Sequence, residues 1–67
     1  MLNIQLNGER RELEGSVSVT ELLDRLGFTG KRLAVELNKE ILPKSLHATT
    51  MLNDGDIIEV VGAVGGG

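Results

Sequence analysis

Residues 53–61 read Asn-Asp-Gly-Asp-Ile-Ile-Glu-Val-Val, a turn that leads directly into a short β-branched segment. Asn, Asp and Gly favour turns, whereas Ile and Val favour strands. Side chains alternate between the two faces of a strand, which places Ile58 and Val60 on one face and Ile57, Glu59 and Val61 on the other. Because a glutamate is rarely buried without a partner, Ile58 and Val60 are predicted to face the core. We therefore expect Ile57 and Val61 on the open face, as a candidate docking patch for a partner.

The strand is followed by Gly62-Ala63-Val64 and then by Gly65-Gly66-Gly67. Glycine has no side chain to bury and loses the most backbone entropy on ordering. We therefore expect one folded domain over residues 1–64 and a flexible glycine tail over residues 65–67. A backbone without Cβ atoms can enter a slot too narrow for side chains, so Gly65 and Gly66 are candidates for binding in a partner's channel. A frayed terminus without function is the alternative.

The group that such a tail would deliver is the α-carboxylate of Gly67. This carboxylate is ionised near neutral pH and is a poor electrophile, so chemistry there requires activation. A mixed anhydride with a nucleotide would provide it. A partner enzyme would have to supply the nucleotide, because the sequence contains no Walker-type glycine loop.

The N-terminal residues predict a β-hairpin. Leu2, Ile4 and Leu6 alternate with polar residues, which is the period of a strand with one buried face. Asn7-Gly8 is a strong signal for a two-residue hairpin turn, since both residue types tolerate positive φ. Residues 9–14 are expected to return as a polar strand.

A single amphipathic helix is predicted to follow the hairpin. Ser18 and Glu21 have the spacing of a capping box. The apolar residues spaced as one helical stripe are Val19, Leu22, Leu23 and Leu26. Gly27 stands where a left-handed residue commonly ends a helix.

Two further strands are predicted between the helix and residue 53. Residues 33–38 alternate between apolar and polar, and residues 38–40 resemble a tight turn. Ile41-Leu42 forms a short strand that Pro43 restricts to a sheet edge. Residues 44–50 read as an irregular link with one helical turn, after which Met51 and Leu52 are expected to cover the core.

The predicted order is β-β-α-β-β-β, which indicates an α+β fold. Two hairpins around one helix give the β-grasp, or ubiquitin-like, arrangement. We expect a mixed sheet of four to five strands with the helix packed on one face. The first and last strands, both apolar, are expected to pair in parallel at its centre. Because one fold serves many functions, this prediction does not by itself identify the activity.

Three segments make the chain resemble the ThiS family, the small sulfur carriers of thiamine biosynthesis. They are Asp54-Gly55-Asp56, the turn and strand from Asn38 to Pro43, and the terminal Gly66-Gly67. The resemblance implies that a ThiF-type, E1-like partner adenylates the Gly67 carboxylate with ATP. Sulfur from a donor protein then gives a C-terminal thiocarboxylate, which donates sulfur to a ThiG-type thiazole synthase. The chain would thus be a co-substrate and not an enzyme, with no bound cofactor beyond these transient modifications of Gly67.

Several alternative functions stay open at the level of the sequence. The small subunit of molybdopterin synthase also ends in two glycines, although such chains have more sequence between the helix and the third strand. Carriers of other sulfur-transfer pathways and ubiquitin-like modifiers have similar ends. A non-catalytic β-grasp interaction domain with an inert tail is the alternative from another class.

Composition and motif content exclude several other classes of function. The 67 residues include no cysteine and one aromatic residue, Phe28, and carry a net charge of -3. Nucleic acid is not expected as a partner, because it favours basic surfaces. Asp54, Asp56 and Glu59 lack the full pattern of a calcium loop, so we expect a turn stabilised by Asx-type hydrogen bonds and no metal site. His47 has no companion ligand, and we place it on the surface or in the link. Without a secretory segment, a cytoplasmic protein that is monomeric when free is expected, with no membrane association.

Overall fold

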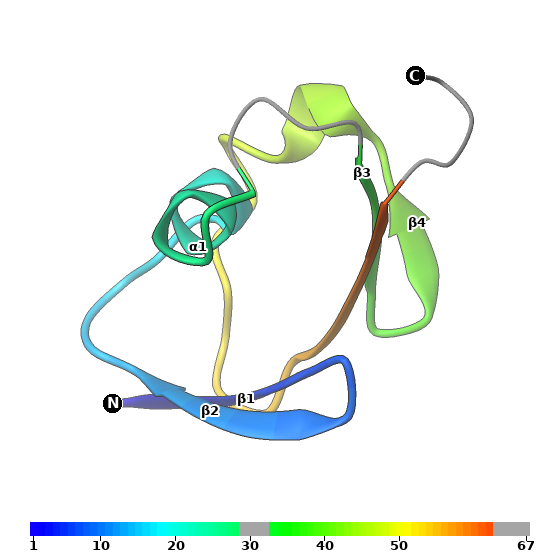
Figure 1. Cartoon of the computed structure of the whole chain (residues 1–67). Helices are drawn as coiled ribbons and strands as arrows, with labels where there is room; N and C mark the ends of the chain where they lie inside the picture. Colours follow the sequence, from blue (N-terminus) through cyan, green and yellow to red (C-terminus); the bar gives the residue numbers. More distant parts are fainter. Residues whose placement is uncertain (29–32, 63–67) are drawn as a thin grey trace.

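The structure, a computed structural model, describes residues 1–28 and 33–62, which form one mixed sheet and one α-helix (Figure 1). Within these residues the sheet has five strands in the order β2-β1-β5-β3-β4. The strands are β1 (Leu2–Leu6), β2 (Glu9–Leu13), β3 (Leu33–Leu37), β4 (Glu40–Leu42) and β5 (Ile57–Gly62). The helix α1 spans Val19–Arg25, and the short 3-10 helix η1 spans Lys44–Leu46. The predicted β-grasp arrangement is confirmed. No helix of the described residues is long and apolar enough to cross a membrane.

The first hairpin forms as the sequence predicts. β1 and β2 pair antiparallel, with Leu2 opposite Leu13 and Leu6 opposite Glu9. The connecting residues Asn7 and Gly8 have φ angles of 49° and 83°. Two consecutive positive φ values give a turn whose twist matches that of the flanking strands, which is why Asn-Gly is favoured there.

The helix begins and ends at the residues that carry its signals. The Glu21 N–H donates to Ser18 Oγ at 3.1 Å, and the Ser18 N–H donates to Glu21 Oε1 at 3.2 Å, which completes the capping box. Past the C-terminus of the helix, Gly27 has a φ of 80°. Val19, Leu22 and Leu23 are buried, so the predicted apolar stripe is the face that packs on the sheet.

β5, the last strand in the sequence, lies in the middle of the sheet. It pairs in parallel with β1, where Gln5 is opposite Ile57 and Leu6 is opposite Ile58. On its other side it pairs antiparallel with β3, from Leu37 opposite Ile58 to Leu33 opposite Gly62. The parallel contact of the first and last strands is thus confirmed.

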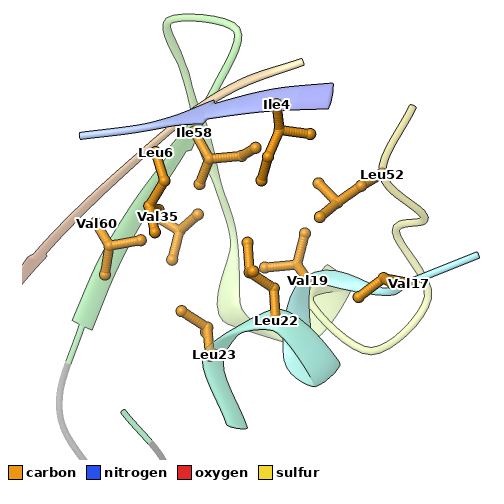
Figure 2. Close-up of a cluster of buried hydrophobic side chains, with 10 residues drawn as sticks. All are labelled: Ile4, Leu6, Val17, Val19, Leu22, Leu23, Val35, Leu52, Ile58 and Val60. Carbon is orange, nitrogen blue, oxygen red and sulfur yellow. The ribbon is translucent and has the colours of Figure 1, made fainter. Parts of the chain in front are cut away.

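The core fills the space between the sheet and α1. Figure 2 shows that side chains from the sheet and from the helix point toward one another, with Leu52 beside them. The ten buried apolar residues are Ile4, Leu6, Val17, Val19, Leu22, Leu23, Val35, Leu52, Ile58 and Val60. All ten are aliphatic, as a chain with a single aromatic residue requires.

Of two predictions for the link after β4, one is wrong and the other is right only in part. Met51 does not cover the core, since 45% of its surface is exposed, and its backbone forms an isolated bridge with Ser18. His47 lies in the link, directly after η1, which is one of its two predicted places, but it is not on the surface, since only 7% of it is exposed. Its Nε2 lies 3.1 Å from the carbonyl oxygen of Leu42, which can only accept, so Nε2 donates. The His47 carbonyl accepts from the Thr20 N–H at 3.1 Å, so this residue joins the link to the helix.

The turn before β5 uses its two aspartates as structural acceptors. Asp54 Oδ1 accepts from the Asn3 N–H at 2.7 Å. The buried Asp56 accepts from the Asn53 N–H through Oδ2 at 2.7 Å and from Asn38 Nδ2 through Oδ1 at 3.1 Å. The turn forms as expected, with the Asp56 N–H donating to the Asn53 carbonyl at 3.1 Å, but neither aspartate makes the expected Asx-type hydrogen bond to the N–H two residues after it. Gly55, with a φ of 89°, permits the reversal.

Replacing Asp56 by alanine should destabilise the domain by about 1–3 kcal/mol, because donors of Asn53 and Asn38 lose their acceptor at a buried site. The free energy of unfolding in urea measures this loss. Asp54→Ala is the matched control, and it should cost less because its hydrogen bond to Asn3 is exposed. Equal losses in the two variants would contradict the burial argument.

Candidate functional site

The predicted reacting group, the carboxylate of Gly67, lies outside the described residues, as do Gly65 and Gly66. The structure describes the segment from which these residues continue, namely β5 and its end at Gly62. The candidate site is therefore the exposed sheet face around β5, and the contacts that anchor this strand support it.

The side chains of β5 alternate between the core and the open face as predicted. Ile58 is fully buried and Val60 is 7% exposed, whereas Val61 is 60% exposed. Glu59 is exposed, and Ile57 is half-buried. The predicted docking residues thus lie on the face opposite α1, with Val61 the more accessible of the two.

Neighbouring strands enlarge this face beyond the two residues that the sequence identifies. Ala34 lies opposite Val61, and Glu36 lies opposite both Glu59 and Ile41. Residues directly opposite one another in a sheet point to the same side. We call the surface formed by Ala34, Glu36, Ile41, Ile57, Glu59 and Val61 the open sheet face.

Ile41 is the residue of this face that sequence reasoning missed. It is 76% exposed, the largest exposed fraction among the large apolar residues of the described chain. Sequence analysis assigned it only to a short edge strand. The register of the β3–β4 hairpin places it beside Glu36, and the two-residue turn at residues 38–39 is the signal that could have fixed that register.

The open sheet face carries two carboxylates of like charge at its centre. Glu36 and Glu59 are directly opposite in the β3–β5 register. Like charges in this arrangement destabilise a sheet in isolation. A partner that placed a cationic side chain between them would relieve this repulsion, while Ile41, Ile57 and Val61 offer apolar contact around the pair. The face therefore suits a protein surface that is apolar with a basic centre.

Two asparagine side chains form hydrogen bonds with the backbone of β5, one at its first residue and one further along. At its start, Asn38 Oδ1 accepts from the Ile57 N–H at 2.9 Å. Further along, Asn7 Oδ1 accepts from the Val60 N–H at 2.8 Å, and Asn7 Nδ2 donates to the Val60 carbonyl at 3.3 Å. Asn7 and Asn38 both have positive φ, in the turns of the two hairpins. β5 is thus anchored on both sides by side-chain amides as well as by neighbouring strands.

The described residues supply no metal centre. Within residues 1–28 and 33–62, no group of three or more His, Cys, Asp or Glu side chains could hold a metal ion. Asp56 and His47 make hydrogen bonds to groups of the fold itself. This part of the chain offers an exposed sheet face and a strand anchored by hydrogen bonds, which continues in the sequence toward Gly67.

Comparison with known proteins gives a consistent family for this chain. The ThiS family model matches residues 4–67. The sulfur carrier protein ThiS of Thermus thermophilus is 41% identical over 64 residues, which cover 96% of this chain and 98% of that protein. A thiazole synthase of Paramagnetospirillum magneticum is 44% identical over 66 residues, and the chain spans only 20% of its length.

A solved structure has the same fold. The crystal structure of a thiamine biosynthesis protein (ThiS) from Geobacter metallireducens matches with a TM-score of 0.84 and 36% identity. The match covers 98% of this chain and 100% of that one. The likeness in fold and the likeness in sequence therefore extend over the same residues.

Proposed function

Because this chain belongs to the ThiS family, we propose that the Gly67 carboxylate is the group on which it carries sulfur. The chain is a β-grasp sulfur carrier of thiamine biosynthesis. The observation that supports the proposal is the range of residues that the family model matches, from residue 4 through the terminal glycines to residue 67.

The chemistry at Gly67 proceeds in two steps in this proposal. A carboxylate oxygen attacks the α-phosphorus of ATP on an adenylating enzyme, and pyrophosphate leaves. The resulting acyl-adenylate has a good leaving group, so in the second step the terminal sulfur of a donor protein's persulfide attacks the carbonyl carbon and AMP departs. A thiol then attacks the donor's sulfur atom in the acyl disulfide that has formed, so that the S–S bond breaks, the thiocarboxylate is released and a disulfide is left on the donor side. The thiocarboxylate that forms is a better nucleophile than the carboxylate it replaces, and its sulfur can be passed on.

The folded domain contributes recognition and reach to this reaction, and the partners contribute the catalytic groups. Residues 62–67, fully extended, span about 20 Å at roughly 3.3–3.6 Å per residue. That length allows Gly67 to enter a buried active site while the sheet stays on the partner's surface. Tethered sulfur is also held near its acceptor at high effective concentration.

The acceptor in this proposal is a ThiG-type thiazole synthase. Support comes from two thiazole synthases, each of which the chain matches over 20% of its length. Such proteins contain a carrier-like segment and a much longer remainder in one polypeptide. A carrier and an acceptor that act on each other in turn gain from such a connection.

The open sheet face is the proposed docking surface for these partners. Val61 and Ile41 offer exposed apolar area, and Glu36 with Glu59 offers paired negative charge. The segment that leads to Gly67 begins at the end of β5, the strand that carries Val61 and Glu59. A partner that holds Gly65 and Gly66 in a narrow channel would therefore contact the open sheet face as well.

Conversion of the purified chain tests the proposed function. The chain is incubated with the adenylating enzyme of its own genome, ATP and a sulfur source, and its intact mass is then measured. We expect one oxygen to be replaced by sulfur, with the change located at Gly67 by fragmentation. Omitting ATP is the control. An unchanged mass in the complete mixture would refute the proposal.

A further inference from the structure

The side chain of Asn7 continues the pairing of β1 with β5 after the backbone of β1 has turned away. The Gln5 N–H donates to the Asp56 carbonyl and the Asn7 N–H to the Ile58 carbonyl, each at 2.9 Å, in the even steps of a parallel ladder. The next step would bring a carbonyl oxygen to the Val60 N–H. Asn7 Oδ1 occupies that place at 2.8 Å, and Asn7 Nδ2 donates to the Val60 carbonyl at 3.3 Å. The carboxamide of Asn7 thus takes the place of a backbone peptide group that β1, which has turned away, no longer supplies.

The residue type at position 7 serves two purposes at once. The hairpin turn needs a positive φ there, and asparagine tolerates its value of 49°. The turn alone would also accept glycine. Only a short side chain with both a donor and an acceptor can satisfy both backbone groups of Val60 as well. The turn requirement therefore does not account for the Asn7 contacts.

Val60 is the last residue of β5 that the described chain holds from both sides. β3 pairs with Val60 through Val35, and Asn7 holds it from the side of β1. Val61 and Gly62 continue to pair with β3 and are exposed. The contacts of Asn7 thus mark the point from which the chain runs on toward Gly67.

We propose that Asn7 is a positioning residue for the reaction at Gly67, an inference that rests on the proposed function. A partner bound to the open sheet face must find the carboxylate at a set distance from that face. Every backbone residue left unfixed has to be ordered during docking, which lowers the population of productive complexes. Misplacement of a reacting group by about 1 Å can lower a rate by about 100-fold. Without Asn7, the stretch from Val60 to Gly62 is held by β3 alone and has more conformational freedom to lose on docking.

Asn38 provides a matched control within the same chain. It also has a positive φ, 52°, in a hairpin turn, and its Oδ1 also accepts from a β5 N–H, that of Ile57. Ile57 begins β5, at the end opposite to the segment that leads to Gly67. Asn7→Gly and Asn38→Gly therefore each remove one carboxamide that forms a hydrogen bond with β5. Both substitutions keep a residue that accepts a positive φ.

The experiment measures stability, hydrogen exchange of the Val60 amide and the steady-state kinetics of acyl-adenylate formation for both variants. Asn7→Gly should accelerate exchange at Val60 and lower kcat/KM by about fivefold or more, the factor expected for ordering one further backbone residue. The loss should lie mainly in kcat, since the open sheet face is unchanged. Asn38→Gly should lower stability without a comparable loss of kcat. Asn7→Asp keeps the acceptor for the Val60 N–H and should recover part of the activity.

Two outcomes would overturn the inference, and a third would overturn the proposed function. Equal losses of kcat in the two glycine variants, or an unchanged kcat in Asn7→Gly, would overturn the positioning role of Asn7. Should Asn7→Gly not fold, Asn7→Asp is compared with Asn38→Asp instead, and Asn7→Asp should show the larger loss of kcat, since it loses the donor to the Val60 carbonyl. If the wild-type chain forms no acyl-adenylate, the proposed function is overturned instead. Hydrogen exchange at Val60 needs no partner, so it still measures the hydrogen bond from the Val60 N–H to Asn7.

Discussion

A chain extended by one alanine after Gly67 should fold normally and fail to be activated. The added residue displaces the reacting carboxylate by roughly 3.3–3.6 Å and gives it a side chain. A channel shaped for glycine backbones excludes a Cβ, and a displaced reacting atom loses the geometry that makes the step fast. We expect no thiocarboxylate by intact mass under conditions that convert the native chain completely.

Two matched variants separate displacement from side-chain size. A chain with one glycine added tests displacement alone, and Gly67→Ala tests the Cβ alone. Both should be converted more slowly than the native chain. The unfolding transition of all three variants should match that of the native chain, which shows that the domain is unaffected. Conversion of the alanine-extended chain at the native rate would sink the idea that partners recognise the end by its geometry.

Val61→Asp should weaken binding to the adenylating enzyme by about tenfold or more, because an apolar contact is lost and an unpaired charge is brought into the interface. Val61 is 60% exposed, so the substitution should change the free energy of unfolding by no more than about 1 kcal/mol. Isothermal calorimetry or surface plasmon resonance gives the dissociation constant. Urea unfolding gives the stability.

Two further substitutions make this result specific to the open sheet face. Ile41→Asp should weaken binding in the same direction, since Ile41 lies on that face beside Glu36. Met51→Asp is the control, because Met51 is also exposed but pairs with Ser18 outside the sheet. Unfolding of Val61→Asp would mean that the two faces of β5 are reversed. If Val61→Asp and Ile41→Asp both bind the adenylating enzyme with the native affinity, a docking role for the open sheet face is contradicted.

The features that the sequence predicted well are those with local causes. The structure confirms three such features, each of which depends on residues that are close together in the sequence. They are the Asn7-Gly8 turn, the Ser18 capping box and the alternation in β5. The position of β5 at the centre of the sheet could also be predicted, because it follows from the apolar character of two strands.

The features that were missed depend on contacts between distant segments. His47 is buried where the link after η1 meets the start of α1, through the hydrogen bond from the Thr20 N–H, and nothing in residues 44–50 indicates that contact. The exposure of Ile41 depends on the register of a hairpin with only three residue pairs. The role of Asn7 was hidden because its turn signal already explained the residue, whereas its amide contacts a residue 53 positions away.

The central place of β5 has a consequence for how the protein is made. β1 and β3 are not neighbours, and β5 joins them into one sheet. A ribosome must therefore synthesise residues 57–62 before the sheet can assemble, and contacts of such long range form late and slowly. Chains that stop short of this strand lack the centre of the sheet, and we expect proteases to cleave them readily. We therefore expect survival of the folded carrier to depend on synthesis of the strand that precedes its C-terminal glycines.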